Sequence, residues 1–239
     1  MPEPQRIPVG RRRRRPTRTG TVLSEELIVS AALELIEAPG GSALTVRRLG
    51  EALGCDPSAV YRYFANTDAL LLAVADRLIG DSFEGYTPGE DWTAALRDFA
   101  TRVHRSVLSH PRLATVRAAR VTAGPAECRA VDTGIGILLR AGFPPAEAVR
   151  LYRTFIDTVL AHAALDAEVA GLTAPQRRQE SRAWHDVYGA LPPGGYPNLH
   201  TVRDHLAAMA DSAFPDALDL LLAQFAARLG RGGPDGGRG

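Results

Sequence analysis

Arginine is the residue type whose placement in this sequence most directly suggests a chemistry. Residues 1–20 hold seven Arg and one Glu, residues 21–239 hold 21 Arg and 26 acidic residues, and Lys is absent. Guanidinium groups bind phosphate oxygens, and a dense basic cluster is typical of nucleic-acid partners. We expect residues 1–20 to be a disordered basic arm, either simply solvated or bound to DNA phosphates. The candidates for phosphate contact are Arg11, Arg12, Arg13, Arg14, Arg15 and Arg18.

The residue types that usually carry catalysis or bind metals are too scattered to form a site. Cys55 and Cys128 are 73 positions apart, and the six His include no His-Glu-x-x-His pair. His200 and His205 are five positions apart, which places them off a common helix face. Gly134-Ile-Gly136 lacks the third glycine of a dinucleotide-binding turn and lies inside a helical pattern. We therefore expect no enzyme activity, no metal, no cofactor and two free thiols.

A helix, a tight turn and a second helix are predicted between Leu44 and Phe64. Thr45 is a suitable N-cap for the first helix, and Asp56 with Pro57 behind it for the second. Gly54 lies where a left-handed residue would end the first helix. Gly50 should let the two helices cross closely. Their small shared core is expected from Leu49, Leu53, Val60 and Phe64. A helix mounted in this way presents its N-terminal residues to the major groove, so the segment predicts a DNA-binding helix-turn-helix.

Two further helices flank the helix-turn-helix. Ser24 caps one that is expected over about 24–38 and ended by Pro39-Gly40-Gly41, and Asn66-Thr67 cap another over about 68–79. Residues 21–80 are therefore expected to form a DNA-binding domain of four short helices.

The stretch from Ile28 to Leu71 resembles the N-terminal domain of the tetracycline-repressor (TetR) family. Three runs carry the resemblance: Ile28-Val-Ser-Ala-Ala-Leu-Glu-Leu-Ile36, Leu44-Thr-Val-Arg-Arg-Leu-Gly50 and Val60-Tyr-Arg-Tyr-Phe-Ala-Asn-Thr-Asp-Ala-Leu-Leu71. The resemblance implies a transcriptional regulator with double-stranded operator DNA as its partner.

The resemblance also implies which side chains of this domain contact DNA. It places Ser58 and Ala59 against base edges and Arg62 at a base or at the backbone. It also implies contacts with the DNA backbone for Thr45, Arg47, Tyr61, Tyr63 and Thr67. At position 67 the family commonly has Lys instead of Thr. Because residues 21–80 carry four Arg against eight acids, we hypothesise that the arginine arm supplies much of the phosphate neutralisation, by way of the adjacent minor groove.

The remainder of the chain is expected to form a larger helical domain. Apolar periodicity is helical throughout, so we predict an all-α protein in which Gly80–Glu90 joins the two domains. Residues 81–230 would form a ligand-binding and dimerisation domain, and 231–239 a flexible tail. Helices are predicted near 91–109, 111–122, 125–141, 145–170, 174–188, 199–211 and 214–229. The absence of a long apolar run or secretory signal favours a cytoplasmic protein.

Two helices of the larger domain have apolar stripes wider than one buried face requires. They are the helices over 145–170 and 214–229. Two such helices from each of two subunits would form a four-helix interface, so we predict a homodimer on a palindromic operator, with half-sites near one helical turn apart. A monomeric core is the alternative.

The segment from Tyr196 to Leu222 resembles, more loosely, the C-terminal domain of the tetracycline repressor, which implies an effector pocket among the helices. When Gly142-Phe143 is matched to the family's Gly-Phe, Ala118 replaces the His that helps hold magnesium-bound tetracycline, and Leu165, beside Asp166, replaces the carboxylate. Apolar walls with a few polar groups favour a small apolar or aromatic effector. The pocket candidates are Phe99, Val103, Arg117, Val121, Tyr152, Phe155 and His162.

The function predicted from the sequence is a ligand-responsive repressor, released from its operator by a small molecule. An activator of the same fold is the alternative, followed by a helical adaptor that does not bind DNA, or an enzyme.

Overall fold

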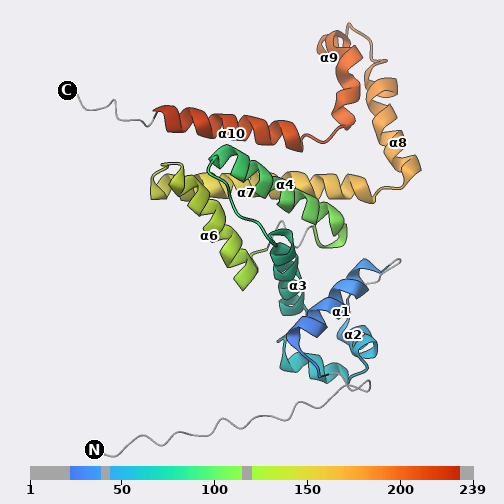
Figure 1. Cartoon of the computed structure of the whole chain (residues 1–239). Helices are drawn as coiled ribbons and strands as arrows, with labels where there is room; N and C mark the ends of the chain where they lie inside the picture. Colours follow the sequence, from blue (N-terminus) through green and yellow to red (C-terminus); the bar gives the residue numbers. More distant parts are fainter. Residues whose placement is uncertain (1–21, 39–43, 115–119, 232–239) are drawn as a thin grey trace, which may run out of the picture. The chain divides into compact units, whose positions relative to one another are not determined.

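Every regular element in the described residues is a helix. The structure, a computed structural model, describes residues 22–38, 44–114 and 120–231 (Figure 1). The predicted all-α fold class is therefore confirmed. The arginine arm, Arg117, Ala118 and residues 232–239 lie outside the described residues.

The chain divides into two compact units, the first ending at Val74 and the second beginning at Ala75. The division falls inside one helix, α3 (Thr67–Ser82), a few residues before the expected domain end at residue 80.

The first unit consists of the helices expected from its capping residues. They are α1 (Glu25–Glu37), α2 (Val46–Leu53), the 3₁₀ helix η1 (Pro57–Arg62) and the start of α3. The Ser24 hydroxyl accepts from Leu27 N at 3.2 Å, and the Asn66 side chain accepts from Ala69 N at 2.8 Å. The third helix is shorter than the expected run to Phe64 and is wound as a 3₁₀ helix. The core of this unit includes Ile28, Ala32, Leu49, Leu53, Val60, Phe64 and Leu70.

The second unit is built around the long helix α7. Its elements are α4 (Trp92–Ser109), η2 (Pro111–Leu113), α6 (Pro125–Arg140), α7 (Pro145–Gly171), α8 (Ala174–Ala183), the π-helical η3 (Trp184–Tyr188), α9 (Pro197–Val202), η4 (Arg203–Ala210) and α10 (Phe214–Arg231). One core joins α4, α6, α7 and α10 through residues such as Leu96, Phe99, Leu138, Leu151, Phe155 and Leu218.

The helix predicted over 111–122 is wrong at its C-terminal end. Residues 111–113 form a 3₁₀ turn, and residues 120–124 are not helical. Ala123 has φ +53°, which no helix accommodates. Side chains compete for the backbone there, because Ala123 N donates to Glu127 at 2.8 Å and Gly124 N to Thr122 Oγ1 at 3.1 Å.

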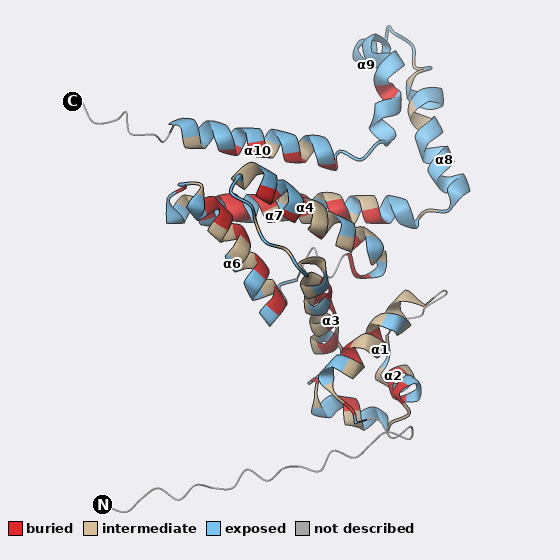
Figure 2. Cartoon of the chain, viewed as in Figure 1, coloured by how far each residue is buried: buried red, intermediate tan, exposed pale blue. Residues whose placement is uncertain are grey.

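The start of α10 is held against α4 and α7 by a polar cluster. Asp166 Oδ2 lies 2.7 Å from His104 Nε2 and accepts a hydrogen bond from the Ser212 hydroxyl at 2.5 Å. The His104 ring stacks on Phe214, with centroids 4.0 Å apart. The segment that precedes α10 is packed very differently, because Leu206 is the only buried residue between 172 and 213 (Figure 2).

Candidate DNA-binding and effector sites

The turn between α2 and η1 depends on two glycines. Gly54 ends α2 at φ +60°, a left-handed conformation that glycine adopts without strain. A Cβ on Gly50 would lie 3.0 Å from the Cys55 carbonyl oxygen and 3.1 Å from Pro57 N. This close approach lets the two helices of the helix-turn-helix pack tightly, as the sequence predicted.

The start of η1 is fixed by Asp56, whose carboxylate accepts from Ser58 N at 2.8 Å. Hydrogen bonds from the Ser58 hydroxyl and then from its N–H hold the pKa of Asp56 below its ordinary value. Ser58 is exposed and Ala59 half-buried, so the first turn of η1 presents a short, accessible surface. A small side chain at each position lets a helix terminus approach base edges closely.

Most of the other predicted DNA contacts are also accessible. Thr45 caps α2 and is exposed. Arg47, also exposed, forms an ion pair with Glu51 of the same helix at 3.1 Å. Tyr61 is 54% exposed and Arg62 is exposed. At the start of α3, Thr67 is half-buried.

Tyr63 differs from Tyr61 in its surroundings. It is half-buried, and its hydroxyl donates to the Leu23 carbonyl at 2.6 Å, across 40 positions of the sequence. A hydroxyl has one proton, so Tyr63 cannot donate to a phosphate while this bond is present. In this conformation its role is to attach the segment before α1 to the end of η1.

The second unit contains a cavity of about 710 Å³, within the usual size range of small-molecule sites. The C-terminal half of α3, with Phe83 behind it, forms one wall, and α4, α6, α7 and the loop 120–123 form the others. The walls are mainly apolar and include the packed rings of Phe83 and Phe99, whose centroids are 4.4 Å apart.

One polar group in the cavity wall has no partner. The Tyr152 side chain is 7% exposed, yet its hydroxyl makes no hydrogen bond to any other residue in the described ranges. Burial, with a smaller contribution from the Glu127 carboxylate, raises the pKa of Tyr152 well above its ordinary value. The ring is accommodated by Gly134, where a Cβ would lie 2.2 Å from Tyr152 Cε2. Tyr152 therefore provides a protonated hydroxyl with free hydrogen-bonding capacity.

The Asp76 carboxylate of α3 joins the α3 wall of the cavity to the α6 wall. It accepts from Thr122 Oγ1 at 3.1 Å, Ala126 N at 3.2 Å and Glu127 N at 2.9 Å. The N-cap residue of α6, Gly124, has no side chain to cap the helix itself. Asp76 thus provides the N-terminal cap of α6 from another helix.

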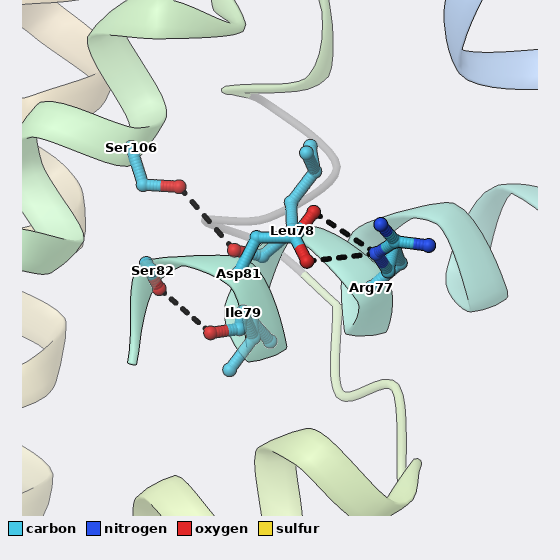
Figure 3. A network of polar contacts seen from close by, with 6 residues as sticks. All are labelled: Arg77, Leu78, Ile79, Asp81, Ser82 and Ser106. Carbon is cyan, nitrogen blue, oxygen red and sulfur yellow. Dashed lines mark hydrogen bonds and ion pairs between the residues drawn. The ribbon is translucent and has the colours of Figure 1, made fainter. Parts of the chain in front are cut away.

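The same part of α3 is also attached to α4. Figure 3 shows the Ser106 hydroxyl of α4 donating to the Leu78 carbonyl at 3.4 Å. Within α3, Arg77 and Asp81 pair at 2.7 Å, and the Ser82 hydroxyl donates to a carbonyl of its own helix (Figure 3). The α3 wall of the cavity is therefore bonded to both α4 and α6.

Comparison with known families decides the identity of this arrangement. Residues 28–74 match the family "Bacterial regulatory proteins, tetR family", and residues 85–229 match "Tetracyclin repressor-like, C-terminal domain". The second match alone covers more than half of the chain. The chain belongs to the TetR family.

Individual TetR-family proteins are similar over different lengths. The class G tetracycline repressor of Vibrio anguillarum is 28% identical over 213 residues, which cover 86% of this chain and 94% of that protein. The class C tetracycline repressor of Escherichia coli is 33% identical over 128 residues, 53% of this chain. This chain thus spans only 58% of the class C repressor.

A solved TetR-family structure has a closely similar fold. The Streptomyces coelicolor protein ActR, in complex with actinorhodin, superposes with a TM-score of 0.77 at 25% identity, covering 87% of this chain and 99% of that one. In the part of the chain that the structure describes, no helix is long and apolar enough to cross a membrane.

The predicted effector residues of this TetR-family chain fall into three groups. Four of them line the cavity, namely Phe99, Val103, Val121 and Tyr152. Phe155 is fully buried behind the wall against Phe99, and half-buried His162 is not among the lining residues. Arg117 lies outside the described residues.

Sequence reasoning missed the walls contributed by α3 and α6, and all of the loop before α6 except Val121. The missed lining residues include Ile79, Phe83, Arg120, Thr122, Glu127, Asp132 and Ile135. Acidic residues at 127 and 132, in a helix that is otherwise apolar on one face, were the available signal.

Of the positions matched to the magnesium-tetracycline site, Leu165 and the neighbouring Asp166 lie in the described residues. Leu165 is exposed, and Asp166 is bonded to His104 and Ser212. Ala118 is outside the described ranges, and within them no group of three His, Cys, Asp or Glu side chains could hold a metal ion.

The two helices with wide apolar stripes also carry exposed apolar side chains outside those stripes. On α7, large apolar side chains remain exposed at Val149, Leu165 and Val169, and on α10 Leu220 is 74% exposed. Both helices also contribute buried residues to the core of the second unit.

Proposed function

We propose that this TetR-family protein is a homodimeric transcriptional repressor that a small molecule releases from a palindromic operator. The observation that carries the proposal is that one chain has both kinds of site. The first unit exposes the start of η1 at Ser58, and the second contains a mainly apolar cavity with a free Tyr152 hydroxyl. Helix α3 is continuous between the two units, which supports a mechanical connection.

The DNA contacts would come from residues around α2 and η1. Ser58 and Ala59 would lie at base edges, while Thr45, Arg47, Tyr61, Arg62 and Thr67 would contact the backbone or, for Arg62, a base. Contact by Tyr63 would require exchange of its bond to Leu23. The arginines Arg11–Arg15 and Arg18 would neutralise further phosphates.

Release would follow from linkage between the two sites. The effector must bind the form that does not fit DNA more tightly than the form that does, because a ligand shifts an equilibrium only by its differential affinity. The exposed apolar residues of α7 and α10 support the homodimer, whose twofold axis would match a palindrome. The protein would act in the cytoplasm, without catalysis.

A gel shift with the purified full chain on its own upstream intergenic DNA, across a salt series, tests this function. Saturable, palindrome-dependent binding that weakens steeply with salt is expected. A reporter fused to the bound promoter then shows whether the protein represses or activates. Reporter expression should rise when the gene for this protein is deleted. If neither this DNA nor a genome-wide selection yields a specific site, the proposed function is wrong.

A further inference from the structure

The polar groups that line the cavity indicate the kind of molecule that it binds. This inference rests on the proposed function, because it names the chemistry of the effector in the same cavity. Three features carry it: the aromatic walls, the free hydroxyl of Tyr152, and the balance of charge among the lining residues.

The walls favour a flat aromatic molecule. Phe83 and Phe99 pack with centroids 4.4 Å apart, and the Tyr152 ring meets Phe99 edge-on at 6.4 Å. Aliphatic residues of α3, α6 and α7, such as Ile79, Ile135 and Ile156, complete the apolar lining. Aromatic rings stack on or meet such walls edge-on with an energy beyond simple burial.

The Tyr152 hydroxyl can donate to a hydrogen-bond acceptor on the effector. It has no partner within the described residues, and its oxygen is accessible rather than fully buried in the wall of the cavity that Tyr152 lines. Because burial and Glu127 both disfavour the phenolate, the raised pKa of Tyr152 keeps the group protonated and able to donate. A carbonyl or ring oxygen on the effector would supply the missing acceptor.

The charges of the lining residues disfavour an anion. The cavity is lined by three acidic residues, Glu127, Asp132 and Asp157, and by two basic ones, Arg120 and Arg153. Arg153 is already paired with Asp157 at 2.5 Å. Asp132 has no ion pair or hydrogen bond with another residue of the described ranges. A positive group near Asp132 would compensate this carboxylate, whereas a negative group would add to the repulsion.

We infer that the effector is a planar aromatic cation that carries an oxygen acceptor, with the acceptor at Tyr152 and the positive group at Asp132. The cavity thereby selects its ligands by charge as well as by shape.

A matched set of anthraquinones tests this inference on the full-length protein by isothermal titration calorimetry. The set is 2-(aminomethyl)anthraquinone, 2-(hydroxymethyl)anthraquinone and anthraquinone-2-carboxylate, which share ring and carbonyls but are a cation, neutral and an anion at pH 7. 2-(Aminomethyl)anthracene is the cation without carbonyls. We expect the aminomethyl quinone to bind about tenfold more tightly than the carboxylate, with the neutral compound between them.

Two substitutions separate the two contacts. Tyr152→Phe keeps the ring and should weaken all three anthraquinones about fivefold while leaving the anthracene unchanged. Asp132→Asn should reduce the preference for cation over anion about threefold. Glu168→Gln, which removes an exposed carboxylate of α7 outside the cavity, is the matched control and should leave the preference intact.

The inference is overturned if the carboxylate binds as tightly as the amine, if none of the four compounds binds, or if Tyr152→Phe weakens the anthracene as much as the quinones. Operator binding is measured on the same preparation. Specific operator binding without the expected ligand order contradicts only the effector chemistry, whereas the expected ligand order without any specific operator contradicts only the proposed repressor.

Discussion

Gly124 and Asp76 fit together only because position 124 carries no side chain: a Cβ there would lie 2.2 Å from Asp76 Cγ. The space is used by the Asp76 carboxylate, which accepts from the first free N–H groups of α6 at Ala126 and Glu127. A negative charge at this end also interacts favourably with the helix dipole. One acidic side chain of α3 therefore fixes the start of α6, the helix that forms another wall of the cavity.

Gly124→Ala should displace this carboxylate and uncap α6. We expect the free energy of unfolding to fall by about 1–2 kcal/mol, the usual effect of losing an N-cap with its buried bonds. Urea denaturation followed by circular dichroism measures it. Gly171→Ala at the exposed end of α7, where a Cβ would meet nothing within 4 Å, is the control and should cost nothing.

A double-mutant cycle shows whether the effect passes through Asp76. Asp76→Ala alone removes the same cap, so the double variant should be hardly less stable than the worse single variant. Additive losses would mean that Gly124 acts through something other than Asp76.

Local signals in the sequence were enough to place most helices. Ser24, Thr45, Asp56 and Asn66 each bond to a backbone N–H two or three residues ahead, so their effect can be recognised from neighbouring residues alone. The left-handed turn at Gly54 is a local signal of the same kind.

Contacts between distant segments could not be predicted in this way. The hydrogen bond from Ala126 N to the Asp76 carboxylate joins positions 50 apart, and no residue near Asp76 in the sequence indicates it. The same network keeps residues 120–122 out of a helix, where the apolar pattern predicted one. The cavity walls on α4 and α7 followed from apolar stripes, but those on α3 and α6 depend on packing that one sequence does not specify.

Tyr61, in η1, and Tyr63, just after it, should differ in what the loss of the hydroxyl changes: operator affinity for Tyr61 and stability for Tyr63. Tyr61→Phe should lower operator affinity about tenfold, because its hydroxyl no longer binds a phosphate, and leave the free energy of unfolding within about 0.5 kcal/mol. Tyr63→Phe should lower the free energy of unfolding by about 1 kcal/mol, because the hydrogen bond to Leu23 is removed. Gel shifts and urea denaturation of both variants check this, and the reverse pattern would exchange the two roles.

The cap of α4 makes a specific contribution to acid sensitivity. Hydrogen bonds from the Thr93 hydroxyl, and then from Ala94 N and Thr93 N, hold the pKa of Asp91 below its ordinary value. A carboxyl whose pKa is lowered by folding stabilises the protein above its unfolded pKa, and this stabilisation disappears as the pH falls through the folded value.

Asp91→Asn should therefore lose less thermal stability than the wild type between about pH 5 and about pH 3, since an amide caps without titrating. Melting temperatures over this range measure the difference. Glu90→Gln removes the neighbouring exposed carboxylate, which caps no helix, and should behave like the wild type. Equal acid sensitivity of Asp91→Asn and wild type would contradict the assignment.

Deletion of residues 1–18 should weaken operator binding and also change how binding depends on salt. Residues 21–80 carry more acids than Arg, so most of the released counterions would be those displaced by Arg11–Arg15 and Arg18. The plot of log affinity against log salt should become less steep by about 0.9 for each phosphate that the arm no longer neutralises. A full-length variant with these six residues changed to Lys keeps the charge and should keep the slope. If the deletion lowers affinity but leaves the slope unchanged, the arm does not neutralise phosphates, and the charge for DNA binding must come from the helix-turn-helix itself.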